Sequence, residues 1–264
     1  MVTVFTPTYN RAYCLGRLYK SLAMQTDSDF EWLIVDDGSN DDTGEMIKGF
    51  ISEGKIGIKY LYQENAGKHV AINAGSEQAC GELFFVVDSD DELTNDAIAL
   101  VNSRWPNLRM DSQCVGMCFA RSNKAKDVII CPLTAMSHLD CSTIDAVYRY
   151  KLVGDKAEIF RTDLIRENKF PVYRGEKFVT EALVWHRISY GKYLRYYPEA
   201  IYICSYLPDG LTACSNKLHK SNPKGMLRYY WELLWYKLPI FKKIKALVWI
   251  LYYFLHIALN ILKK

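Results

Sequence analysis

Apolar and polar residues alternate in blocks along the first hundred residues. Four apolar runs have the β-branched and aromatic content of buried strands. These runs are Val2–Pro7, Glu31–Asp37, Ile56–Gln63 and Glu82–Asp88. Between them, apolar residues recur at helical spacing, so we expect helices over Ala12–Gln25, from Thr43 onward, and over Lys68–Ala79. This alternation predicts right-handed crossovers and a mostly parallel central sheet with flanking helices, which is an α/β fold.

The second half predicts shorter elements and no internal repeat or low-complexity linker. A helix is expected from Asn95 to about Leu108, and an amphipathic helix over Val179–Tyr190. The expected strands are Val115–Ala120, Val128–Cys131, Ala157–Phe160, Tyr193–Tyr197 and Ala200–Tyr206, with a turn at Asp209-Gly210. We therefore predict one domain over residues 1–215, followed by a tail over residues 216–264.

The tail differs in its pattern from the rest of the chain. Ala246–Leu262 has only His256 and Asn260 as polar residues and is bracketed by lysines. About 20 apolar residues are needed to span a bilayer, so this segment is slightly short. Trp249, Tyr253, His256 and Asn260 share one helical face, which favours a helix lying in the membrane interface.

Charge separates the tail from the domain. The chain has a net charge of +3, but from Lys217 onward it has ten Lys or Arg residues and one acid, Glu232. The preceding residues are therefore net acidic, and only the tail is suited to a polyanionic surface. We expect it to associate with an anionic membrane. Packing of the tail on the domain, or a dimer contact, would give the same pattern.

Composition excludes several classes of protein. Half of the residues are hydrophobic and 14% are aromatic, which argues against disorder. The eight cysteines include no CxxC pair, which favours reduced core thiols over a zinc site or a disulfide framework. No basic and apolar leader precedes the first predicted strand, so we expect the protein to begin in the cytoplasm.

Polar residues cluster where the four predicted strands end. In a parallel sheet these carboxyl ends meet at one edge, where ligands bind. The residues brought there are Thr6, Pro7, Thr8, Tyr9, Asn10 and Arg11 from the first strand, Asp36 and Asp37 from the second, Glu64, Asn65, Gly67 and Lys68 from the third, and Asp88, Asp90 and Asp91 from the fourth. The sequence thus predicts one binding rim.

The aspartates after the fourth strand carry the most specific chemistry. Three acids on one short turn are unfavourable unless they face water or a cation, so a divalent metal is a natural partner. A solvated, helix-capping turn is the alternative. No GxGxxG or GxxxxGK[ST] motif is present, and an EF-hand starting at Asp88 fails at Leu93 and Ala99. A bound nucleotide would be held through Mn²⁺ or Mg²⁺ between the aspartates and its diphosphate.

Four segments together resemble a known family. They are TPTYNR, VDDGSNDDT, ENAGKHVAINAG and VDSDDEL, in this order over roughly the first hundred residues. They are similar to the inverting family-two glycosyltransferases with the GT-A fold, of the bacterial surface-polysaccharide type. Four linked motifs are more specific than any one of them.

The resemblance implies roles for individual residues. Tyr9 would stack on the base, Asp37 would bond the base imide, and Asp36 would be structural. Asp90 would contact the metal, with Asp88 toward the ribose and Asp91 as a cap or outer group. Lys68 would lie near the base or phosphates, or be an ordinary helix-start lysine. The implied nucleotide-sugar site is Pro7, Thr8, Tyr9, Arg11, Asp37, Lys68, Asp88 and Ser89, and the implied metal ligands are Asp90, Asp88 and, in a later loop, His219.

The resemblance also implies a general base in the second half. The family commonly has a Glu-Asp pair at the start of a helix there, and Glu181 aligns with its second acid, although Thr180 replaces the first. Glu176 is the fallback. A carboxylate stabilised by the helix dipole would look the same at Glu181.

These observations predict a metal-dependent inverting glycosyltransferase. It would move a sugar from a nucleotide diphosphate, UDP in particular, to a hydroxyl of a glycan acceptor carried by a lipid, at the cytoplasmic face of the inner membrane. Residues 1–108 would be the nucleotide-binding half and residues 109–215 the acceptor-binding half. We expect no nucleic-acid partner, and an oligomer stays open. The alternatives are a nucleotidyltransferase and a non-catalytic sugar-nucleotide-binding membrane scaffold.

Overall fold

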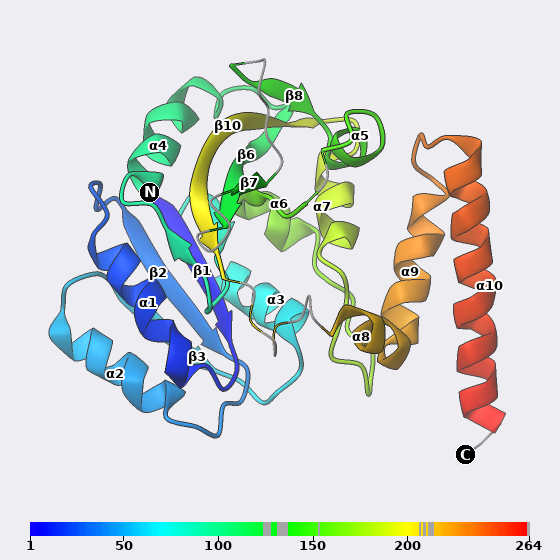
Figure 1. Cartoon of the computed structure of the whole chain (residues 1–264), viewed down its shortest axis with the longest axis horizontal. Helices are drawn as coiled ribbons and strands as arrows, with labels where there is room; N and C mark the ends of the chain where they lie inside the picture. The colour runs from blue at the N-terminus through cyan, green and yellow to red at the C-terminus, as the bar shows by residue number, and fades with distance from the viewer. Residues whose placement is uncertain are drawn as a thin grey trace.

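The computed structural model describes residues 1–123, 128–130, 137–152, 154–205, 207, 210 and 214–262. A single sheet runs through the molecule, with helices on both faces and a helical hairpin beside it (Figure 1). The strands are β1 (Val2–Thr8), β2 (Phe30–Asp36), β3 (Ile58–Tyr62), β4 (Leu83–Val86), β5 (Glu92–Leu93), β6 (Cys114–Asn123), β7 (Val128–Ile130), β8 (Leu139–Cys141), β9 (Ala157–Arg161) and β10 (Tyr193–Cys204). The helices are α1 (Ala12–Ala23), α2 (Thr43–Glu53), α3 (Lys68–Gln78), α4 (Ala97–Arg104), α5 (Thr143–Tyr148), α6 (Thr162–Glu167), α7 (Ala182–Ser189), α8 (Ser215–Ser221), α9 (Pro223–Leu233) and α10 (Ile240–Leu262).

The sheet is parallel in its first half and mixed in its second. Its strand order is β3-β2-β1-β4-β9-β6-β10-β5, with β7 on β6 and β8 on β10. β1 pairs in parallel with β2 and β4, whereas β9 is antiparallel to both β4 and β6. Thr8 pairs with Asp36, which in turn pairs with Tyr62, so these strands end together at one edge. The predicted mixed α/β architecture is confirmed, and the parallel part is the first hundred residues.

Alternating side chains of the buried strands supply two cores. Val4 and Trp32 point to the face covered by α1, α2 and α4. Phe5 and Leu33 point to the opposite face, which α3, α6 and α7 cover. Such near-continuous apolar strands are typical of sheets buried on both sides. The polar residues that follow the strands are therefore excluded from both cores and lie at the strand ends.

Several predicted boundaries were wrong. The helix predicted to reach Leu108 ends at Arg104 and continues as a 3₁₀ turn over Trp105–Asn107, because Pro106 has no backbone N–H to donate to a longer helix. The two strands predicted after Tyr193 are one bulged strand, β10, with register shifts between Tyr197 and Tyr202. The strands β5 and β8 and the helices α5, α6 and α8 were not predicted. Two predicted strands end at residues outside the described part of the chain, Cys131 and Tyr206. The predicted turn begins at another such residue, Asp209.

The tail forms a hairpin of α9 and α10. The helix predicted over Ala246–Leu262 begins earlier, at Ile240. Tyr230 of α9 stacks on Trp249 and Tyr253 of α10, with ring centroids 5.7 and 5.9 Å apart. Within the part of the chain that the structure describes, no helix combines the length and hydropathy needed to cross a bilayer.

Candidate active site

A cleft of about 1010 Å³ opens at the carboxyl ends of the parallel strands. Its walls come from both halves of the domain. Tyr9, Asp37 and Asp88 follow β1, β2 and β4, while Glu181 comes from the start of α7. Cavities of 300 to 1,000 Å³ are typical of small-molecule sites, so this one has room for a nucleotide-sized ligand. Most of the residues predicted at the rim line this cleft, whereas Thr6, Asn10, Asp36 and Glu64 are not among its lining residues.

The loop after β1 is attached to the loop after β2. Asp37 N donates to Thr8 O at 2.8 Å, and Asn10 N donates to Ser39 Oγ at 2.8 Å. Asn10 has φ of 52°, a left-handed conformation that asparagine tolerates better than most residues. Pro7, Thr8, Tyr9 and Arg11 all line the cleft, as predicted from the sequence. Tyr9 is 45% exposed, so its ring is accessible to a ligand.

The two aspartates after β2 are both engaged by protein groups. Asp36 accepts from Ser39 N at 2.8 Å and Tyr60 Oη at 3.0 Å, which fits the structural role expected for it. Asp37 accepts from Gln63 Nε2 at 2.7 Å and from the amides of residues 66 and 67, each at 2.8 Å. Asp37 therefore fixes the loop before α3. Its carboxylate lines the cleft, and its contact with a base stays a prediction.

The aspartates after β4 differ in their surroundings. Asp91 is buried and accepts from Tyr202 Oη and Ser205 N, each at 2.7 Å, so it ties the acidic turn to the end of β10. Burial and the charge of Asp88 raise the pKa of Asp91 to about 7. Burial and Asp88 also raise the pKa of Asp90. The carboxyl groups of Asp90 and Asp91 are thus harder to ionise next to Asp88. A cation bound at this turn would stabilise their charged forms.

Lys68 joins this turn to the opposite wall of the cleft. Its Nζ lies 2.5 Å from Asp88 Oδ1 and 2.7 Å from Glu181 Oε1. Burial alone would lower the pKa of the ammonium, but the two carboxylates raise it above its usual range. Burial alone would raise the pKa of Asp88, and Lys68 instead lowers it. Lys68 and Asp88 are therefore both charged in this structure.

The segment before α7 places Glu181 in the cleft. Gly67 has φ of 102°, and a Cβ built on it would lie 2.0 Å from the carbonyl oxygen of Lys177. Glycine is thus required for the two segments to touch. On the other side, a Cβ on Gly225 would lie 2.8 Å from the carbonyl oxygen of Phe178. Lys177 thus packs against the start of α3 and Phe178 against α9. These contacts fix the chain three residues before Glu181.

Glu181 itself is the N-cap of α7, but its side chain makes no capping hydrogen bond. The predicted helix over Val179–Tyr190 is shorter than expected, and it begins one residue after Glu181. The carboxylate points instead to Lys68 and lines the cleft. A simple helix-capping role therefore does not account for this residue.

Glu176, the fallback base, has a different position. Its two carboxylate oxygens accept from Lys224 N at 2.8 Å and from Gly225 N at 2.9 Å, at the start of α9. The side chain is buried and is absent from the lining of the cleft. Carboxylates at helix N-termini satisfy free amide groups in this way. The structure therefore argues against Glu176 as a base.

The residues expected to hold a metal are not assembled as a complete set of ligands. Among the described residues, no three His, Cys, Asp or Glu side chains form a ready metal site. His219 of α8 lines the cleft and packs on Phe178, with ring centroids 5.6 Å apart. Asp88 and Asp90 remain as a pair on one turn. Mg²⁺ is commonly held by one or two carboxylates with substrate phosphates and water, so this pair fits a metal that arrives with a nucleotide.

Three residues of the cleft region were not identified from the sequence, and they are Arg121, Glu158 and Tyr202. The guanidinium carbon of Arg121, on β6, lies 3.9 Å from the ring centroid of Tyr202, on β10, and Arg121 Nη1 lies 3.9 Å from Asp91 Oδ2. Glu158 of β9 also lines the cleft, and burial raises its pKa to about 7. All three residues lie on mostly apolar strands. The only signal in the sequence was a charged or hydroxyl-bearing side chain within an otherwise apolar run.

Comparisons with known proteins agree with this geometry. The glycosyl transferase family 2 model matches residues 3–117. A GalNAc(5)-diNAcBac-PP-undecaprenol beta-1,3-glucosyltransferase of Campylobacter jejuni is 34% identical over 100 residues, covering 37% of this chain and 32% of that protein. The matches span between 14% and 32% of the lengths of the curated relatives, so the similarity is to a part of each of them.

Solved structures match almost the whole chain. Staphylococcus aureus TarS 1-349, in complex with UDP-GlcNAc, superposes with a TM-score of 0.72 at 20% identity, covering 95% of this chain and 71% of that one. The mannosyltransferase PcManGT of Pyrobaculum calidifontis, with GDP-Man and Mn²⁺, gives 0.61 at 18% identity, covering 94% and 69%. The mixed sheet with flanking helices thus matches the GT-A fold. Residues 3–117 of this chain are thus similar to the family 2 glycosyltransferases.

Proposed function

We propose that the protein is a metal-dependent inverting glycosyltransferase. It takes a sugar from a nucleotide diphosphate, UDP in particular, and transfers it to a hydroxyl of a glycan acceptor. The observation that carries this proposal is the bridge from Asp88 through Lys68 to Glu181, which sets one carboxylate of the second half opposite the aspartates of the family domain. Inversion requires a base on the side of the sugar opposite the leaving group, and Glu181, which lines the cleft, is our candidate for it.

The reaction follows from these positions. Glu181 accepts the proton of the acceptor hydroxyl while its oxygen forms a bond to the anomeric carbon. The bond from that carbon to the diphosphate oxygen breaks at the same time, so the configuration inverts. Lys68 and Arg11, both in the cleft, offset charge on the nucleotide. A divalent ion held by Asp90 and Asp88 would neutralise the leaving diphosphate when bound.

The identity of the donor rests on fold neighbours and on the cleft. TarS has been solved with UDP-GlcNAc and PcManGT with GDP-Man, which supports a nucleotide-sugar donor for the present chain. Exposed Tyr9 offers a ring face on which a base can stack, and a UDP-sugar is our first candidate. The C. jejuni relative is named for an undecaprenol-linked acceptor, which supports a lipid-linked glycan as the acceptor of the present chain.

The decisive experiment is a donor panel. Purified protein is incubated with several UDP- and GDP-sugars, with and without Mn²⁺, and release of the free nucleoside diphosphate is measured. Metal-dependent release from one UDP-sugar is the expected result. Release of inorganic diphosphate from a nucleoside triphosphate and a sugar phosphate would show a nucleotidyltransferase instead. Donor binding without turnover in the presence of lipid-linked acceptors would show a non-catalytic protein.

A further inference from the structure

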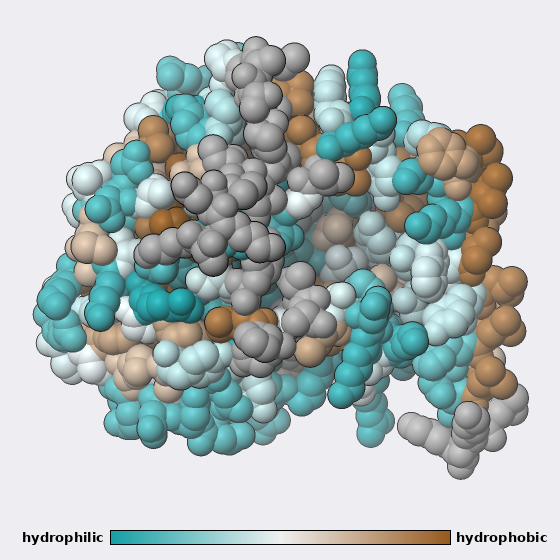
Figure 2. All heavy atoms as spheres, in the orientation of Figure 1, coloured by the Kyte–Doolittle hydropathy of each residue, from teal (hydrophilic) through white to brown (hydrophobic). Residues whose placement is uncertain are grey.

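The outer face of α10 is a large apolar surface that nothing in the described chain covers. Tyr230 packs on the inner face through Trp249 and Tyr253, so the helix turns its other side away from the molecule. The side chains there that are between 51% and 62% exposed include Ile244, Leu247, Val248, Leu251, Phe254 and Leu255. Figure 2 shows this surface as the continuous hydrophobic edge over α10. Patches of this kind mark interaction sites on soluble proteins.

Charge identifies the kind of partner. At 100° per residue, Lys243 and Lys245 lie at the two margins of the apolar face, and Lys242 precedes them in the same turn. Residues 240–264 contain no acid, and two further lysines end the sequence. The single acid after Lys217, Glu232, is paired with Arg187 and Arg228. Cationic margins beside an apolar face fit anionic lipid headgroups above acyl chains.

A second copy of the chain fits this face less well. Lys242, Lys243 and Lys245 lie in the first two turns of the helix, so parallel pairing would place them against their equivalents. Antiparallel pairing would bring them toward the end of the partner helix, where the sequence continues with two further lysines, and no acid of the helix would offset them in either case. Like charges brought together repel. An anionic bilayer has no such conflict.

We propose that α10 lies in the plane of an anionic membrane, with its outer face inserted among the acyl chains. This inference concerns how the protein is held and goes beyond the proposed transfer reaction. The helix is 23 residues long. In the plane of the membrane, its outer face would contact acyl chains while its inner face stays packed on α9.

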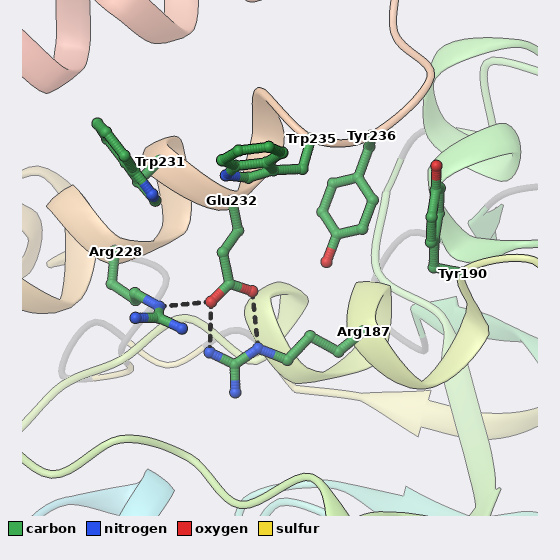
Figure 3. A pocket seen from close by; sticks show the side chains of 7 residues that line it. All are labelled: Arg187, Tyr190, Arg228, Trp231, Glu232, Trp235 and Tyr236. Carbon is green, nitrogen blue, oxygen red and sulfur yellow. Dashed lines mark hydrogen bonds and ion pairs between the residues drawn. The ribbon is translucent and has the colours of Figure 1, made fainter.

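The hairpin is fixed to the wall of the cleft. Glu232 of α9 accepts from Arg187 Nε at 2.7 Å and Nη2 at 2.6 Å, and it also binds Arg228 (Figure 3). Arg187 belongs to α7, the helix that Glu181 precedes. The same α9 is capped by Glu176. A membrane-bound α10 would therefore hold the cleft at a set height and direction relative to the lipid surface, which suits an acceptor embedded in that surface.

The test is co-flotation of the full chain with lipid vesicles. Wild-type protein is expected to float with phosphatidylglycerol-containing vesicles and less with pure phosphatidylcholine. The triple variant Val248→Asn, Leu251→Asn, Leu255→Asn should lower partitioning about tenfold or more, because it removes apolar contact area from the inserted face. The matched control Ile51→Asn, Met110→Asn, Val172→Asn changes exposed apolar residues elsewhere and should float like wild type.

Circular dichroism and gel filtration of each variant complete the design. Unaltered flotation of the folded triple variant, or no flotation of wild type on anionic vesicles, would overturn the proposal. A wild-type dimer that becomes monomeric in the triple variant, without flotation of either, would instead assign the face to a second copy. None of these readouts uses catalytic activity, so failure of the transfer reaction leaves the result interpretable.

Discussion

Lys68 Nζ lies 2.7 Å from Glu181 Oε1, although the two residues belong to different halves of the domain. The same nitrogen binds Asp88, so one cation holds two carboxylates that would otherwise repel each other across the cleft. In the proposed reaction, donor binding and proton removal would therefore take place side by side. The link between them is the first place to test.

Glu181→Gln should stop transfer and leave the donor bound. The amide keeps the size of the side chain but cannot accept a proton, and loss of a general base typically lowers kcat by about 10²- to 10⁴-fold. Steady-state kinetics and donor titration measure the two effects separately. Glu176→Gln serves as the control and should retain kcat while lowering stability, since it weakens the cap of α9. Full activity in Glu181→Gln would remove this residue from the mechanism.

Lys68→Met should weaken both steps. Without the ammonium, Asp88 and Glu181 are left as unpaired charges in a partly buried site, and we expect kcat/KM to fall by about tenfold or more. Lys48→Met is the matched control because it breaks the exposed pair with Glu45. That control should behave like wild type. Normal kinetics in Lys68→Met would remove the bridge from the mechanism.

Substitutions of Asp90 and Asp91 should have different effects, one on metal binding and the other on stability. Asp90→Asn is expected to abolish Mn²⁺-dependent UDP binding, measured by calorimetry, with little change in unfolding. Asp91→Asn should instead lower the free energy of unfolding by about 1–3 kcal/mol, because its buried carboxylate accepts from Tyr202 and Ser205. The reverse pattern would assign the metal to Asp91.

Gly67→Ala should damage the site through the backbone. The new methyl group would meet the carbonyl oxygen of Lys177 at 2.0 Å, and φ of 102° is strained for alanine. The segment carrying Glu181 must then shift, so we expect both activity and melting temperature to fall. Gly49→Ala is the control, since it lies in α2 with open space around it and should be neutral or stabilising by about 0.5–1 kcal/mol. Equal activity of both variants would exclude the proposed contact.

The sequence predicted the parts of this arrangement that depend on local pattern. Apolar runs such as Leu83–Val86 located the strands, and the rule for parallel sheets brought Tyr9, Asp37 and Asp88 to one cleft. The bridge by Lys68 could not be predicted, because it depends on the distance between α3 and the segment before α7. The cap made by Glu176 depends in the same way on where α9 packs. Tertiary packing, which periodicity does not encode, decided both.

Acid should destabilise the fold partly through His186. This side chain is 4% exposed on α7, with Nδ1 2.7 Å from Thr143 Oγ1, and burial lowers its pKa from 6.5 to about 4. Between these values the unfolded chain binds the proton and the folded chain does not, so the free energy of unfolding falls as pH drops from 6.5 toward 4. The contribution of this one residue is at most about 3 kcal/mol.

Urea unfolding of His186→Gln measured from pH 7 to 4.5 isolates that contribution. Other groups, including His69, titrate in wild type and variant alike, so the difference between the two curves belongs to His186. We expect the variant to be less stable than wild type at pH 7, since glutamine packs less well, and to lose less stability on acidification. His138→Gln alters an exposed imidazole and should follow wild type throughout. If the curves of wild type and His186→Gln ran parallel, the histidine would have to be protonated in the folded protein, and its contact with Thr143 would have to rearrange to accept the charge.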